Sequence, residues 1–232
     1  MNEETEKLSS DKISTLLFKF SIPAIVGTMI NALYNVVDRI FIGNASHVGS
    51  GGLAGLTIAF PIMIILLSVG ILFGVGGATL YSIRLGQGNR NAARKTLGNS
   101  LLFMIVSSLF LMAIGIIFMD PILVAFGASP DVLPYARSYM SIIFYGAIFQ
   151  VISMGLNNFI RADARPRLAM MTMLIGALSN IGLDWLFIFG FKMGMEGAAL
   201  ATIISQALSM IWTLSYFLRS STLNRIRLID LK

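Results

Sequence analysis

Cysteine is absent from the 232 residues, and histidine occurs once, at His47. Without cysteine the chain can form neither a disulfide nor a thiolate metal site, and one histidine cannot build a histidine-rich one. The sequence also lacks a zinc motif, a P-loop and a nucleophile elbow. We therefore expect neither an enzyme nor a protein with a bound cofactor.

Charge is scarce as well. Charged residues make up 12% of the chain and hydrophobic residues 56%, whereas a soluble domain carries about 25% charged residues. The charges that occur are grouped between long apolar runs, which predicts an all-α, polytopic membrane protein embedded in a lipid bilayer. In such a chain the net charge of +6 fits a positive-inside bias better than a nucleic-acid partner.

Six apolar runs predict a bundle of six transmembrane helices over residues 13–218, because about 20 helical residues cross the hydrocarbon core. The expected spans are Phe20–Gly43, Leu53–Leu80, Thr96–Met119, Ser138–Ile160, Leu168–Phe191 and Gly197–Leu218. Asn44–Gly52 is expected to be a loop, and Pro121–Gly127 a short interfacial helix. Residues 1–12, polar and acidic, predict a cytoplasmic segment without a signal peptide, and residues 219–232 the start of a basic linker.

The basic residues predict the orientation. Of the 17 lysines and arginines, 14 flank the same side of the six predicted spans. Cytoplasmic loops are rich in lysine and arginine. We therefore expect both ends of this segment on the cytoplasmic side of the cytoplasmic membrane.

Polar side chains lie at matching depth in three predicted helices. Counted at 1.5 Å per residue, Asp38, Asp184 and Thr202 lie about 24–27 Å from the cytoplasmic ends of their spans. Asn180 precedes Asp184 by one helical turn and shares its face. Because a carboxylate facing lipid is costly, we expect these four side chains to meet.

A proton or a sodium ion would neutralise such a cluster, which would then be a cation or proton site and the one metal-ion site we expect. Structural alternatives stay open for each residue. Asp38 could pair with a basic residue at the interface, although Arg39 points elsewhere on the helix. Asp184 could make an interhelical hydrogen bond, and Thr202 could bond to its own helix backbone.

A second polar set follows helical spacing and predicts a water-filled cavity. The first helix contributes Asn31 with Tyr34 or Asn35, and the fourth contributes Gln150, Ser153 and Asn157. Gln206 lies one turn from Thr202 in the sixth helix. Alternatively these groups join helices through hydrogen bonds. Several methionines, among them Met29, Met154, Met170, Met171 and Met173, could form a soft apolar wall.

Several motifs, in order along the chain, resemble the multidrug and toxic compound extrusion (MATE) family. They are Tyr34–Gly43 (YNVVDRIFIG), Ala54–Leu56, Phe60-Pro61, Gly155–Ala162 (GLNNFIRA), Ser179-Asn180 with Asp184, and Gly194–Thr202 (GMEGAALAT). The resemblance implies a cation-coupled antiporter, driven by protons or sodium, that exports bulky, often cationic drugs.

The same resemblance implies roles for single residues. Asp38, Asn180, Asp184 and Thr202 would form the coupling site of the amino-terminal lobe. Asn31, Tyr34, Asn157 and Met173 would face the drug cavity, and helix bending at Pro23 would belong to the transport cycle.

The family has about twelve helices in two lobes, so this chain resembles one lobe. It would be a fragment whose partner is the missing carboxy-terminal lobe, or a half-transporter that pairs with a second copy. A flippase for lipid-linked sugars is an alternative, but it would want a basic cavity, and the predicted spans hold almost no lysine or arginine. A non-transporting membrane subunit would not need aligned carboxylates.

Overall fold

The computed structural model describes residues 12–45 and 49–218. The expectations for residues 1–11 and 219–232, and the histidine His47, lie outside these ranges. Within them, six helices are long and apolar enough to cross a membrane. The expectation of an all-α bundle of six membrane-spanning helices is confirmed.

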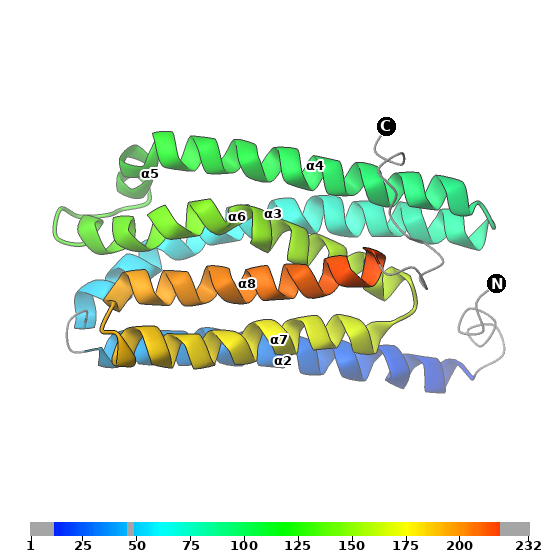
Figure 1. Cartoon of the computed structure of the whole chain (residues 1–232), viewed down its shortest axis with the longest axis horizontal. Coiled ribbons are helices and arrows are strands. Elements are labelled where there is room, and N and C mark those ends of the chain that lie inside the picture. Colours follow the sequence, from blue (N-terminus) through cyan, green and yellow to red (C-terminus); the bar gives the residue numbers. More distant parts are fainter. Residues whose placement is uncertain (1–11, 46–48, 219–232) are drawn as a thin grey trace.

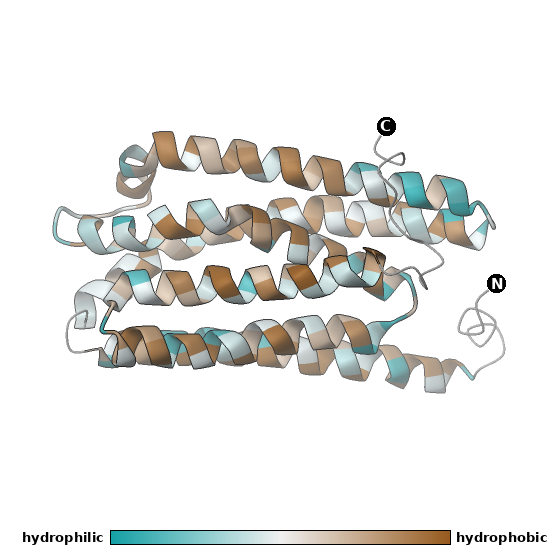
Figure 2. Cartoon of the chain, in the orientation of Figure 1, coloured by the Kyte–Doolittle hydropathy of each residue, from teal (hydrophilic) through white to brown (hydrophobic). Residues whose placement is uncertain are grey.

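The helices run side by side along one long axis (Figure 1). They are α2 (Ile13–Asn44), α3 (Gly49–Gly86), α4 (Arg90–Ile117), α6 (Leu133–Ala162), α7 (Pro166–Asp184, continued by the π-helix η1, Trp185–Gly190) and α8 (Gly194–Leu218). A short helix, α5 (Met119–Ala125), follows α4. In colour by hydropathy, apolar residues dominate the middle of the helices (Figure 2).

The connections define two ends of the bundle. The start of α2, the α3–α4 turn, the α6–α7 connection and the end of α8 share the right-hand end in Figure 1, which we call the basic end. The short helix α5 marks the other, the α5 end. Local signals explain the boundaries: Gly88 turns the chain with φ +75°, and the Asn89 side chain caps α4 by accepting from the Ala92 backbone N–H at 3.0 Å.

Glycines allow α3 and α6 to approach closely. A Cβ on Gly74 would lie 2.7 Å from the Cα of Gly155, and one on Gly55 would lie 2.9 Å from the backbone nitrogen of Ala136. Only a residue without a side chain fits there. The prediction of a loop over Asn44–Gly52 was wrong for residues 49–52, because α3 already begins at Gly49. Gly51 there lies against the Tyr135 ring.

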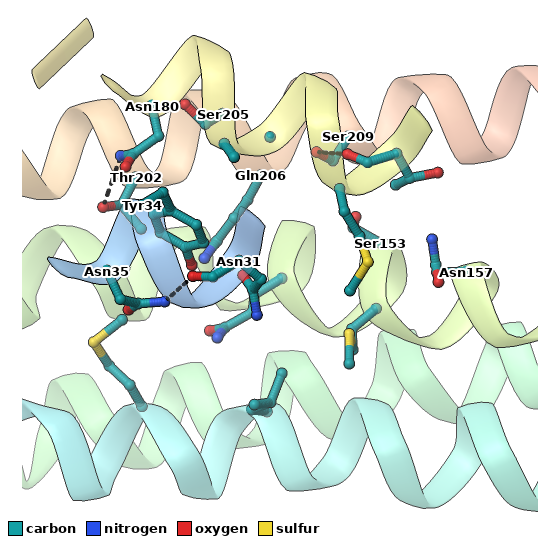
Figure 3. Close-up of a pocket in the computed structure, with 18 of the residues that line it drawn as sticks. Asn31, Tyr34, Asn35, Ser153, Asn157, Asn180, Thr202, Ser205, Gln206 and Ser209 are labelled. Carbon is teal, nitrogen blue, oxygen red and sulfur yellow. Dashed lines mark hydrogen bonds between the residues drawn. The ribbon is translucent and has the colours of Figure 1, made fainter. Parts of the chain in front are cut away.

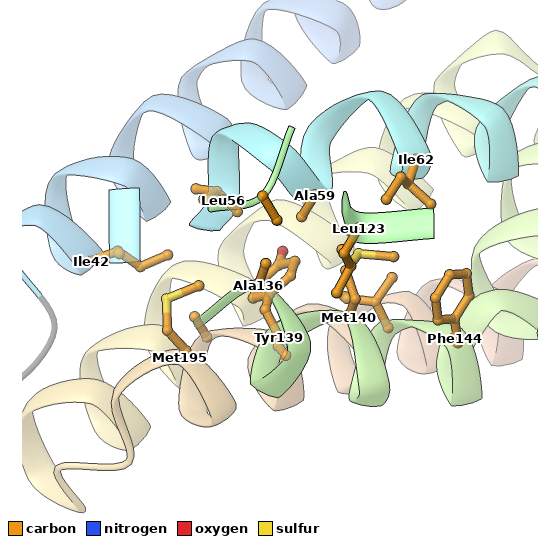
Figure 4. Close-up of a cluster of buried hydrophobic side chains, with 14 of the residues drawn as sticks. Ile42, Leu56, Ala59, Ile62, Leu123, Ala136, Tyr139, Met140, Phe144 and Met195 are labelled. Atoms are coloured by element: carbon orange, nitrogen blue, oxygen red, sulfur yellow. The ribbon is translucent and has the colours of Figure 1, made fainter. Parts of the chain in front are cut away.

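A cluster of buried apolar side chains lies between the helices toward the α5 end of the bundle (Figure 4). Its largest member, Tyr139, comes from α6, and Ile42 and Met195 join it from α2 and α8. The cluster therefore packs α2, α6 and α8 together at this end of the bundle.

Candidate functional site

Two carboxylates are buried where α2 and α7 meet. Asp38 is 7% exposed, and Asp184, the last residue of α7, is 0% exposed. They are close enough to interact electrostatically. Among the described residues Asp38 makes no salt bridge, and the neighbouring Arg39 guanidinium lies over the Phe60 ring, 5.0 Å from its centroid. The pair therefore has no salt-bridge partner in the described part of the chain.

Neutral oxygen atoms complete the site, which we call the acidic pair site: Asp38, Asp184, Asn180 and Thr202. The Asn180 amide donates to the Thr202 hydroxyl at 3.5 Å. Both oxygens of Asp184, Oδ1 of Asp38 and Oδ1 of Asn180 are buried, and none has a hydrogen-bond partner among the described residues. Orphaned buried acceptors are costly, so the site favours a bound positive charge or a proton.

The sequence did not point to Tyr139, which also borders this site. Its buried side chain, on α6, lies near Thr202 and near both carboxylates. A tyrosine in an apolar helix is indistinguishable by spacing from a packing residue. The one available signal is chemical, since a buried phenol usually finds a polar partner.

The oxygen set fits a small hard cation or a proton better than a transition metal. Hard cations take oxygen ligands, and carboxylate, amide and hydroxyl groups supply them here. Within residues 12–45 and 49–218 no three His, Cys, Asp or Glu side chains gather into a metal-binding group. A sodium ion would be held by Asp38, Asp184, Asn180 and Thr202.

A cavity of about 510 Å³ lies among α2, α3, α6, α7 and α8 (Figure 3). Uncharged residues line it: Asn31, Tyr34, Asn35, Phe60, Met63, Ile64, Leu67, Gln150, Ser153, Met154, Asn157, Thr172, Met173, Gly176, Ala177, Asn180, Thr202, Ser205, Gln206 and Ser209. The structure thus brings together six residues that the sequence assigned to a cavity: Asn31, Tyr34, Asn35, Asn157, Met173 and Gln206.

Several cavity donors are bonded to backbone. The Asn35 amide donates to the Asn31 carbonyl at 2.7 Å, and the Asn157 amide donates to the Ala169 carbonyl at 2.8 Å. The side-chain oxygen of Gln150 is buried without a partner among the described residues. Backbone carbonyls therefore occupy some of the cavity donors, and the Gln150 oxygen is free to accept a hydrogen bond from a ligand.

The cavity and the acidic pair site share two side chains. Asn180 and Thr202 line the cavity and also belong to the acidic pair site. Their hydrogen bond, drawn in Figure 3, joins α7 to α8. An ion held by the carboxylates and a ligand in the cavity would therefore contact the same two groups.

Other residues singled out by sequence lie elsewhere. Met154 and Met173 line the cavity, but Met29, Met170 and Met171 do not. Met29 is exposed on the outer face of α2. Pro23 is buried inside α2, which continues through it as a helix. Helical spacing alone could not tell the cavity face from the lipid face for these methionines.

Known proteins resemble this chain over nearly its whole length. A MatE family model matches residues 23–186. The multidrug export protein MepA of Staphylococcus aureus (strain MRSA252) is 29% identical over 95% of the chain and 48% of the relative. The chain thus spans about half the length of the curated relatives it matches.

Two solved structures have a similar fold over about half of their length. The MATE multidrug transporter DinF-BH, solved as a complex with a ligand, is 40% identical with a TM-score of 0.91, over the whole chain and 51% of that protein. A MOP superfamily transporter from Pyrococcus furiosus, described as having a binding pocket of reverse polarity, is 27% identical with a TM-score of 0.83, over 94% of the chain and 48% of that protein. The chain therefore belongs to the MatE (multidrug and toxic compound extrusion) family of membrane transporters.

Proposed function

We propose that this chain is one lobe of a cation-coupled antiporter that exports bulky, often cationic compounds. The observation that carries the proposal is the acidic pair site, in which buried carboxylate oxygens lack partners among the described residues and adjoin a cavity. A proton or a sodium ion serves as the coupling ion, and no resident cofactor is needed.

The cavity supports the substrate class. Acceptor oxygens favour a cationic or hydrogen-bond-donating compound, and Met63, Met154 and Met173 adapt to apolar surfaces of different shape. The lining holds no charged side chain, which speaks against a flippase for the phosphate of a lipid-linked sugar. We propose Pro23 as the point where α2 bends, since proline removes one helical hydrogen bond.

The proposed setting is the cytoplasmic membrane, with the basic end on the cytoplasmic side. A second lobe, or a second copy of this chain, completes the transporter, in keeping with the half-length match to the relatives. The protein is proposed to act without chemical catalysis and without nucleic acid.

Replacement of Asp184 by Asn tests the proposal in cells that express the chain together with the lobe it pairs with. Asparagine keeps the size of the side chain but removes its charge, so ethidium export driven by a proton or sodium gradient should fall to the background level. Asp120→Asn is the matched control, because Asp120 lies in a half-exposed salt bridge with Arg137 (3.4 Å). Undiminished export by the Asp184 variant would refute the proposal.

A further inference from the structure

Four basic residues surround the turn between α3 and α4: Arg84, Arg90, Arg94 and Lys95. We call them the basic turn. No acidic residue occurs between Asp38 and Asp120, so this hairpin contains no carboxylate. Hydrophilic residues are visible at this end of α4 in Figure 2.

The charge of the basic turn is not neutralised by the residues it contacts. The Arg84 guanidinium donates to the Ala92 carbonyl at 2.9 Å and to the Thr96 hydroxyl. The Arg94 guanidinium donates to the side-chain oxygen of Asn91. These acceptors are neutral, and the salt bridge between Arg137 and Asp120 lies at the α5 end. Within residues 12–45 and 49–218, the basic turn therefore has no carboxylate that is shown to neutralise it.

An exposed apolar stripe continues from Lys95 along α4. Leu102, Val106, Phe110 and Ile117 follow Lys95 at helical spacing and so share its face. Their exposed fractions are 41%, 56%, 63% and 71%. We call these four residues the α4 stripe. At 1.5 Å per residue the stripe with Lys95 is about 33 Å long, enough to follow acyl chains through one leaflet and beyond.

We propose that the basic turn and the α4 stripe bind an anionic phospholipid, with its phosphate at the basic turn and its acyl chains along the stripe. The stripe alone would accept any lipid. The uncompensated charge selects the headgroup, since each lysine or arginine near an anionic lipid surface contributes about fivefold in affinity. A zwitterionic lipid also satisfies the stripe, but the cation in its own headgroup offsets its phosphate charge, so it neutralises the basic turn less well than an anionic lipid does.

Native mass spectrometry of the chain tests this, with phosphatidylglycerol or phosphatidylcholine added to the detergent. The chain should retain phosphatidylglycerol in preference to phosphatidylcholine. Arg90→Gln with Lys95→Gln should weaken retention of phosphatidylglycerol about 25-fold. The control pair, Arg137→Gln with Lys192→Gln, removes the same charge outside the basic turn and should leave retention unchanged. Equal retention of the two lipids, or equal loss in both variant pairs, would overturn the proposal.

A salt titration of the unmodified chain keeps the test independent of how the variants fold. Exposed charges are largely screened at 1 M salt, where the Debye length is about 3 Å. The preference for phosphatidylglycerol should therefore disappear there, while the weaker retention of phosphatidylcholine persists. A preference that is unchanged by salt would mean that the apolar face alone holds the lipid, and the proposal would fail.

Discussion

Tyr139 lies beside the polar groups of the acidic pair site. Its side chain, buried in α6, is near Thr202 and both carboxylates, and the Thr202 hydroxyl accepts from the Asn180 amide. Helices α6, α7 and α8 therefore all contribute polar side chains here. Removing the Tyr139 hydroxyl should alter the ion site without opening the bundle.

We predict that Tyr139→Phe weakens the apparent affinity for the coupling ion about 2–10-fold, the usual worth of the one hydrogen bond that its hydroxyl would donate in the ion-bound site. The measurement is the sodium or proton concentration that half-saturates export. The ring stays in place, so the thermal unfolding temperature should change little. Tyr145→Phe is the control, because Tyr145 lies on the same helix but is exposed. An equal shift in both variants would contradict the prediction.

The site residues could be predicted from sequence to different degrees. Asp38, Asn180, Asp184 and Thr202 stood out because polar groups at membrane depth are rare and costly. Their meeting in space follows from that cost and from equal depth. Tyr139 could not be found in this way, because tyrosine is common in apolar helices. The functional roles of all five remain proposals.

At the scale of the helices, charge-free runs predicted how many spans there are better than where each helix ends. Helix α4 begins at Arg90, although the expected span began at Thr96. Charges are excluded from the hydrocarbon layer and not from the helix, so the helix extends past the apolar run. The π-helix after Asp184 was not predicted either. A π-helix differs from an α-helix in its hydrogen-bonding pattern and not in its amino-acid composition.

The contact between α3 and α6 gives a prediction about stability. Gly74→Ala should destabilise the chain by about 1–3 kcal/mol, since the new Cβ would lie 2.7 Å from the Gly155 Cα. We expect the midpoint of thermal unfolding in detergent to fall by several degrees. Gly76→Ala is a close control on the same helix, where a Cβ meets nothing within 4 Å. If both variants have the same midpoint of thermal unfolding, the close contact between α3 and α6 does not stabilise the fold.

At the scale of the whole molecule, the absence of cysteine makes the proposed orientation easy to test. A single cysteine at Gln87, in the α3–α4 turn, should react with a membrane-impermeant maleimide only after cells are opened. A single cysteine at Ser129, exposed between α5 and α6, should react in intact cells. The parent chain, which has no thiol, reports background labelling. The reverse pattern would place the basic end outside.

The position of Asn180 and Thr202, between the carboxylates and the cavity, has a thermodynamic consequence. When two ligands compete for the same amide and hydroxyl, each lowers the other's affinity, and the factor is necessarily the same in both directions. A compound that loosens ion binding tenfold must itself be loosened tenfold by the ion. Antagonistic binding of this kind is what an exchanger requires, and here two neutral side chains suffice to provide it.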